Sequence, residues 1–237
     1  MTPGAETRKE PFWGYEELAL FVGAVLPCLA LAELLIRAGQ AVAPTALSSS
    51  AAKTLAFQSL FYALLLGSLY WLISARYRLP FWRSLRWTFR YRGAWLCFAA
   101  GPALAFALSV LGVALRTPPA SPIQDLVTDR RSLLIVMLFV TLLGPAFEEL
   151  VFRGFLFPLL ARSLGPWPGI LLSAIPFALL HGPQDHWVWQ QVVLVAMAGT
   201  VFGFVRYRTG STAAAASVHV GYNMTFFLGF LVQRWFS

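Results

Sequence analysis

Charged residues are scarce in this sequence: Asp, Glu, Lys and Arg make up 12% of its 237 residues, whereas hydrophobic residues make up 58%. Soluble domains carry about 25% charged and roughly 45–50% apolar residues. Lysine is nearly absent, since Lys9 and Lys53 are the only two, and the formal charge of +8 therefore rests mainly on arginine. With so few polar side chains to cover a water-facing surface, the sequence excludes an ordinary soluble domain and indicates a surface that faces lipid.

Cysteine is also rare, and Cys28 and Cys97 both lie within apolar runs, where we expect neither a disulfide nor a metal site. The arginines stand in short gaps between apolar runs rather than on a solvated face with interspersed aromatics, so membrane topology explains them and no nucleic-acid partner is expected. No cleavable signal peptide is expected, because the first residues are polar and the first apolar run is too long and too late.

Long apolar runs are what the sequence has in abundance. A spanning helix needs about 20 mainly apolar residues, and seven segments qualify: 17–37, 54–74, 94–115, 132–157, 167–186, 188–207 and 211–233. Backbone groups cannot stay unpaired in lipid, and no barrel-like alternation is present. The sequence therefore predicts an all-α, polytopic transmembrane helix bundle of about seven spans (6–8), forming one domain over 1–237.

The gap 75–93 holds six arginines and no acid, which places it in the cytoplasm by the positive-inside rule. Counting outward, the N-terminus is cytoplasmic and, with seven spans, the C-terminus is external. Twelve of the 18 basic residues then lie inside, among them Arg8, Lys9, Arg90, Arg153, Arg162, Arg206 and Arg208. Multi-pass insertion in a plasma or inner membrane is expected. Interfacial anchors at the span ends would be Trp13, Tyr15, Trp95, Trp187, Trp189 and Trp235.

Ionisable side chains inside a bilayer are costly and suggest a functional site. The run GPAFEELVFRG holds Glu148, Glu149 and Arg153. Glu149 and Arg153 are four residues apart, so they share a helical face and can pair. Glu148 lies about 100° around the helix, where it is free to face a cavity. Burial would move the acidity of Glu148 toward the range useful for activating water.

Two more spans carry imidazoles: Phe177 and His181 in PFALLHG, and His219 and Asn223 in SVHVGYN. His219 and Asn223 share a helical face and can both donate to an oxyanion, and a neutral histidine can also accept. Together with Glu148 they resemble a hydrolytic site. Each motif alone has a plainer explanation, a salt-bridged face or an interhelical hydrogen bond. Glu33 is expected to pair with Arg37, and Asp185 and His186 to be solvated in a short loop.

The three motifs in this order resemble the CPBP family, the Abi or CAAX-protease-like membrane proteins, over about residues 130–230. The resemblance implies an intramembrane endopeptidase in which Glu148 activates the attacking water with help from His181. It implies oxyanion stabilisation by His219 and Asn223, and supporting roles for Glu149, Arg153 and Phe177. It implies a mechanism without a cofactor, acting on a membrane-associated peptide or protein substrate within membrane lipid.

Two alternatives stay open. Glu148, His181 and His219 are of the types that bind zinc with an open position, although the HExxH spacing is absent. A non-catalytic binding or bacteriocin-immunity protein, or a small transporter, would use the same polar cluster without hydrolysis, although the inverted repeats of transporters are not evident. The boundaries above also put His181 a turn or two away from Glu148 and His219, an offset that tilt or a break near Pro176 would remove.

Overall fold

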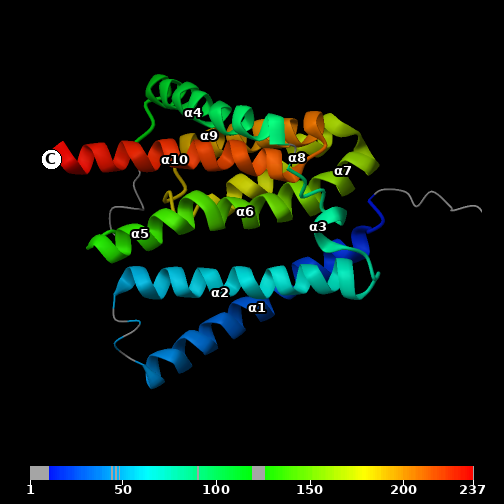
Figure 1. Ribbon diagram of the computed structural model, residues 1–237, viewed down its shortest axis with the longest axis horizontal. Helices are drawn as coiled ribbons and strands as arrows, with labels where there is room; N and C mark the ends of the chain where they lie inside the picture. The colour runs from blue at the N-terminus through cyan, green and yellow to red at the C-terminus, as the bar shows by residue number, and fades with distance from the viewer. Residues whose placement is uncertain are drawn as a thin grey trace, which may run out of the picture.

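The computed structural model describes residues 11–43, 45, 47, 49–89, 91–118 and 126–236, without the side chains of residues 91, 92 and 94. Every regular element within these ranges is a helix. The chain traverses the bundle seven times (Figure 1), as α1 (Tyr15–Val42), α2 continued by η1 (Ser50–Tyr70, Trp71–Ala75), α4 (Tyr91–Ala114), one run from α5 to α7, α8 (Pro166–His181), α9 (Trp189–Thr209) and α10 (Thr212–Phe236). Six of these traverses are long and apolar enough to cross a membrane, and α8 is a shorter apolar helix. The predicted polytopic helical bundle is confirmed.

The fourth traverse is longer than the predicted 132–157 and is not a uniform α-helix. It consists of α5 (Arg130–Leu138), η3 (Phe139–Leu143), α6 (Gly144–Glu149), η4 (Leu150–Leu156) and α7 (Phe157–Leu164), where η3 and η4 are π-helical. Pro145 and Pro158 stand just after the two π segments, where the missing N–H of proline interrupts the regular hydrogen-bond ladder. The π segments flank the short α6, which carries Glu148 and Glu149.

Helix α8 departs from the prediction in two ways. It continues through Pro176 without a break, and it ends at His181 instead of 186. Turns follow from Gly182, and His186 and Trp187 adopt positive φ angles, which a helix cannot accommodate. Asp185 in this loop is half-buried rather than solvated, and burial raises the pKa of its carboxyl.

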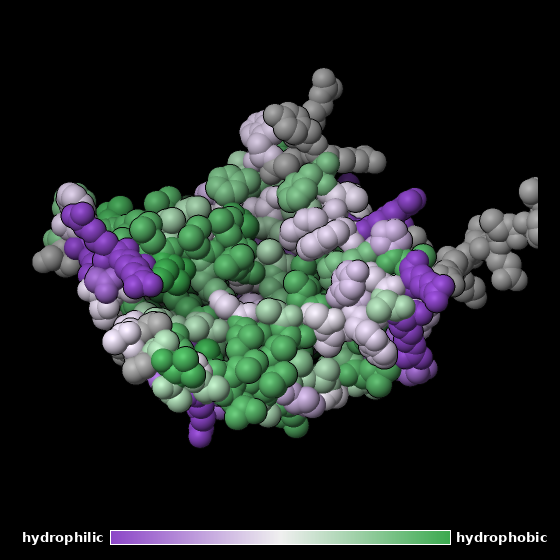
Figure 2. Space-filling model, turned by 60° about the horizontal axis from the view of Figure 1, so that its bottom comes forward, coloured by the Kyte–Doolittle hydropathy of each residue, from purple (hydrophilic) through white to green (hydrophobic). Residues whose placement is uncertain are grey.

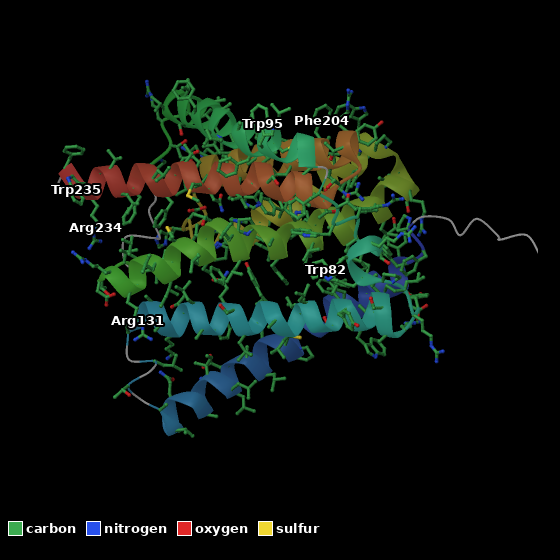
Figure 3. All side chains as sticks on the ribbon, in the orientation of Figure 1. Trp82, Trp95, Arg131, Phe204, Arg234 and Trp235 are labelled. Carbon is green, nitrogen blue, oxygen red and sulfur yellow. The ribbon has the colours of Figure 1, made fainter. Side chains whose placement is uncertain are left out.

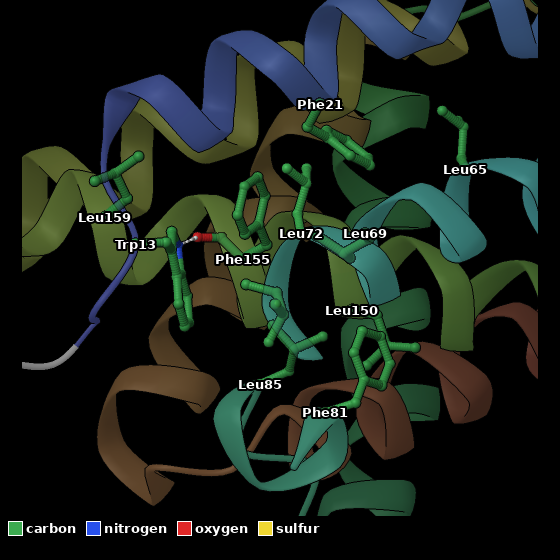
Figure 4. Packing of buried hydrophobic residues seen from close by; sticks show 11 residues of the cluster. Trp13, Phe21, Leu65, Leu69, Leu72, Phe81, Leu85, Leu150, Phe155 and Leu159 are labelled. Atoms are coloured by element: carbon green, nitrogen blue, oxygen red, sulfur yellow. Dashed lines mark hydrogen bonds between the residues drawn. The ribbon is translucent and has the colours of Figure 1, made fainter. Parts of the chain in front are cut away.

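The outside of the bundle is apolar over its middle and hydrophilic at its two ends, as Figure 2 shows for one face. Large hydrophobic side chains lie exposed there, including Leu26, Phe106 and Leu180, as expected of helices whose solvent is lipid. Four of the predicted tryptophan anchors are exposed, but Trp13 is not. Its ring is buried and its Nε1 donates to the Phe155 carbonyl oxygen at 3.1 Å (Figure 4), so Trp13 belongs to the core.

Basic side chains gather at the two ends of the bundle. Arg131 and Arg234 lie near the C-terminal end of α10, and Trp82 marks the opposite end (Figure 3), where α1 begins. Arg153 is an exception, because its side chain is completely buried, and counting it among the cytoplasmic charges was wrong. Arg8, Lys9 and Arg90 lie outside the described residues.

An ion pair, two cysteines and a short helix complete the description of the fold. Arg37 and Glu33 form an exposed ion pair at 2.7 Å. Cys28 and Cys97 are free thiols. Within the arginine-rich gap, the short helix α3 (Phe81–Ser84) inserts Phe81 and, from the following turn, Leu85 into a core shared with Leu150 and Phe155 (Figure 4). Phe81 and Leu85 thus anchor this segment to the bundle, while Trp82 beside them stays exposed.

Candidate active site

Glu148 and Glu149 are neighbours in α6 with opposite surroundings. Glu149 accepts a hydrogen bond from Arg153 Nη1 at 3.1 Å, and both side chains are completely buried, so the predicted ion pair is present. The side chain of Glu148 stays 16% exposed and lines a cavity. Because adjacent helical residues point about 100° apart, one carboxylate is held in the packed interior while the other faces open space.

Arg153 is fixed from three sides. Besides Glu149, it donates from Nη2 to the Gly199 carbonyl oxygen in α9 at 2.7 Å. Its Cζ lies 4.4 Å from the ring centroid of Phe177, a cation–π contact. Gly199 leaves the room for this arrangement, since a Cβ there would stand 2.9 Å from the Phe177 ring and 3.0 Å from Arg153 Nη2.

His219 of α10 lies between the two carboxylates. Its Nδ1 is 3.0 Å from Glu149 Oε1, and its Nε2 is 3.8 Å from Glu148 Oε2. An ionised carboxylate only accepts hydrogen bonds, so Nδ1 carries a proton and Nε2 is directed to Glu148. The ring is buried and stacks on Phe202 of α9 with 4.4 Å between centroids. Glu149 therefore orients the imidazole that meets the more exposed carboxylate.

The second oxygen of Glu148 is held by α2, which the sequence motifs did not identify. Tyr62 donates from its hydroxyl to Glu148 Oε1 at 3.2 Å and accepts from Gln58 Nε2 at 3.1 Å. The Tyr62 ring stacks on Phe147 with 3.9 Å between centroids. Gln58, an amide inside a predicted span and four residues before Tyr62, marks this face of α2 as polar, but it does not identify Glu148 as the partner.

His181 and Asn223 are both anchored to backbone carbonyls. His181 Nδ1 is 2.8 Å from the Phe177 carbonyl oxygen, so Nδ1 donates and a neutral ring keeps Nε2 as an acceptor. Asn223 donates from Nδ2 to the carbonyl oxygen of Val140 in the π segment η3 at 2.8 Å. The second N–H of that amide is not used in this contact. Phe177 packs between the imidazoles, 4.7 Å from His181 and 5.8 Å from His219 between ring centroids.

All four residues predicted to act in catalysis line one cavity of about 260 Å³. Phe177 and His219 connect it to the buried Glu149–Arg153 pair. Two further amides, Gln58 and Gln184, also line it. Most of the remaining wall is apolar or aromatic and includes Leu55, Pro145, Val195, Phe202, Tyr222 and Phe226. The offset expected between His181 and the other residues is absent, because α8 ends at His181 and brings it to the cavity.

The part of the chain that the structure describes contains no arrangement of side chains that matches the zinc alternative. No group of three or more His, Cys, Asp or Glu side chains there is close enough together to hold a metal ion. Glu148 and His219 approach each other, but His219 Nδ1 is directed to Glu149 and His181 Nδ1 to a carbonyl oxygen. The contacts link Arg153, Glu149 and His219 through hydrogen bonds, whereas His181 and Asn223 are each bonded to a backbone carbonyl oxygen.

Comparison with protein families gives one result. Residues 130–225 match the model of the type II CAAX prenyl endopeptidase Rce1-like family. The match begins at α5 and ends within α10, so it covers every motif residue and leaves α1, α2 and α4 outside. It confirms the resemblance to the CPBP family. No curated protein and no solved structure matches the chain.

Proposed function

We propose that the protein is a glutamate-dependent intramembrane endopeptidase. The premise is the match of residues 130–225 to the model of the Rce1-like, type II CAAX prenyl endopeptidases. The observation that carries the proposal is the shared cavity, which is lined by Glu148, His181, His219 and Asn223. A carboxylate, two imidazoles and an amide are the groups that water activation and oxyanion stabilisation require.

In the proposed reaction, Glu148 removes a proton from a water molecule that attacks the substrate carbonyl carbon. Tyr62 occupies Oε1 of Glu148, so Oε2 is the oxygen left to face the water. The Nε2 of His181, an acceptor in the neutral ring, holds the second hydrogen of that water. The proton taken by Glu148 is then delivered to the departing amine, which completes hydrolysis of the peptide bond.

Stabilisation of the tetrahedral oxyanion is assigned to His219 and Asn223. Asn223 Nδ2 carries a second N–H besides the one bonded to Val140, and it donates directly to the oxyanion. His219, held by Glu149 at Nδ1, donates from Nε2 in the ring form that carries a proton on both nitrogens. Arg153 holds Glu149 in position from outside the cavity, and Phe177 packs against both imidazoles at the cavity wall.

The substrate is proposed to be a membrane-associated peptide or protein. The cavity walls are mostly apolar, which suits a segment delivered from the bilayer. A bacteriocin or other peptide precursor, or a C-terminal membrane signal, fits these features. Nothing in the lining is specific for a prenyl group.

The test compares peptides in cells that lack the gene and in cells complemented with wild type, Glu148→Gln or Glu33→Gln. We expect one membrane peptide to accumulate uncut in the deletion and Glu148→Gln strains only. Glu33 is the matched control, since it is a carboxylate in a spanning helix that pairs with the exposed Arg37. Mass spectrometry of membrane and secreted peptides gives the readout. Normal cleavage with Glu148→Gln would refute the mechanism.

Two further arms address the alternatives. A metal-dependent protease would lose cleavage with 1,10-phenanthroline and regain it with zinc, whereas the proposed mechanism predicts cleavage in the presence of the chelator. A non-catalytic immunity or binding protein would keep its phenotype with His219→Ala. We expect that variant to lose both cleavage and phenotype.

A further inference from the structure

A second cavity lies at the end of the bundle where α7 and α9 finish, away from the candidate active site. Its volume is about 700 Å³, and it shares no lining residue with the cavity around Glu148. Arg162 of α7, which lines it, is 14 residues beyond Glu148 along one helical run, or about 21 Å at 1.5 Å per residue. The proposed function does not use this cavity.

Four arginines line this second cavity: Arg83, Arg86, Arg162 and Arg206. They come from α3, the turn after it, α7 and α9. No Asp or Glu is among the described residues that line it. Four guanidinium groups around one concave, partly apolar space create a strong positive potential. An anion bound between them would reduce the electrostatic repulsion among their charges.

Hydrogen bonds to the start of α10 connect two of the segments that carry these arginines. Arg206 is buried and donates from Nε to Thr212 Oγ1 at 3.1 Å. Thr212 in turn donates from Oγ1 to the Leu85 carbonyl oxygen at 2.6 Å and from its backbone N–H to the Arg86 carbonyl oxygen at 2.9 Å. The turn with Arg86 and the helix with Arg206 are thereby tied together, which lowers the entropic cost of binding a ligand.

We propose that this second cavity binds the phosphate of an anionic phospholipid headgroup. Its location at the ends of spanning helices puts it at headgroup depth, and its remaining walls include the apolar Phe12, Trp13 and Leu79. Exposed Trp82 flanks Arg83 on α3, as aromatic residues do at the membrane interface. Basic pockets between helices at a membrane surface are suited to such headgroups.

The test measures retention and binding of phospholipid by the purified full-length protein. Native mass spectrometry follows retained lipid, and titration of a short-chain fluorescent phosphatidylglycerol, with phosphatidylcholine in parallel, gives dissociation constants. The test variant is Arg83→Gln/Arg162→Gln. The control is Arg78→Gln/Arg208→Gln, which removes the same charge from exposed arginines that do not line the cavity.

We expect wild type and the control to prefer phosphatidylglycerol. The cavity variant should bind it roughly 30-fold more weakly, the equivalent of about 1 kcal/mol for each of two arginines near the membrane surface. Equal weakening in both variants would attribute the preference to overall charge and overturn the proposal. Competition by millimolar inorganic phosphate as complete as that by the lipid would also overturn it, because the site would then take free phosphate.

Discussion

At the scale of single residues, the adjacent carboxylates of α6 lie in different surroundings, which suits Glu149 to a structural role and Glu148 to the proposed chemistry. Glu149 is paired with Arg153 and His219 in the packed interior, whereas Glu148 contacts Tyr62 and borders the cavity. Removal of the Glu149 charge is therefore expected to reduce stability, whereas removal of the Glu148 charge is expected to reduce cleavage. Removal of one partner from a buried ion pair leaves the other charge uncompensated.

Glu149→Gln is expected to destabilise the protein by about 3–5 kcal/mol, because Arg153 would stay buried without its counter-charge. Glu148→Gln should leave the unfolding midpoint close to wild type while abolishing cleavage. Denaturation in detergent, followed by circular dichroism, measures both variants. Glu33→Gln serves as the exposed control and should change stability by less than about 1 kcal/mol. Equal stability of the Glu148 and Glu149 variants would contradict this division.

Tyr62→Phe is expected to lower kcat by roughly tenfold to a hundredfold with little change in KM. The hydroxyl donates to Glu148 Oε1, and a hydrogen bond to a charged group contributes about 1.5–3 kcal/mol. The ring still stacks on Phe147 in the variant, so packing is retained. Tyr70→Phe, on the exposed surface of the same helix, is the matched control. An unchanged kcat, or a change confined to KM, would exclude Tyr62 as a positioning residue.

At the scale of elements, the position of α10 depends on a close approach to α4. A Cβ on Gly221 would stand 2.2 Å from the Phe98 carbonyl oxygen, and one on Gly101 would stand 2.4 Å from the backbone nitrogen of Tyr222. Neither backbone can yield without moving a whole helix. Small residues allow such contact between membrane helices. Gly221 lies two residues after His219 and two before Asn223, so this contact sets the depth at which both enter the cavity.

Gly221→Ala should therefore move α10 and reduce cleavage strongly, with a loss of stability of at least about 1–3 kcal/mol from overpacking. Gly229→Ala in the same helix is the control, since a Cβ there meets nothing within 4 Å. Thermal unfolding and cleavage are measured for both variants. Wild-type behaviour of Gly221→Ala would show that the two helices are not packed this closely.

The sequence predicts where the membrane-spanning helices lie better than it predicts where those helices are irregular or end. Apolar length identified each traverse, and the four-residue spacing identified the Glu149–Arg153 pair, because both depend on local helical geometry. The π segments on either side of α6 and the early end of α8 depend on tertiary packing. Tyr62 was missed for the same reason: its partner Glu148 is 86 residues away, and no local pattern connects them.

At the scale of the whole molecule, seven traverses place the start of α1 and the end of α10 at opposite ends of the bundle (Figure 1). Arg83, Arg86, Arg162 and Arg206 share the end where α1 begins, since they line one cavity there with Trp13. The positive-inside rule predicts that this end faces the cytoplasm. The orientation has a direct test in cells, because the two ends differ in access to reagents that do not cross the membrane.

Cysteine labelling measures this orientation. In a variant with Cys28→Ala and Cys97→Ala, a single cysteine is placed at Thr88, beside the arginine-lined cavity, or at Gln233, near the C-terminal end of α10. Intact cells are treated with a membrane-impermeant maleimide. We expect Gln233→Cys to react at once and Thr88→Cys only after the membrane is opened. Both side chains are exposed, so burial does not protect either. Labelling of both in intact cells would contradict seven crossings, and labelling of Thr88→Cys alone would reverse the orientation and place the phospholipid site in the outer leaflet.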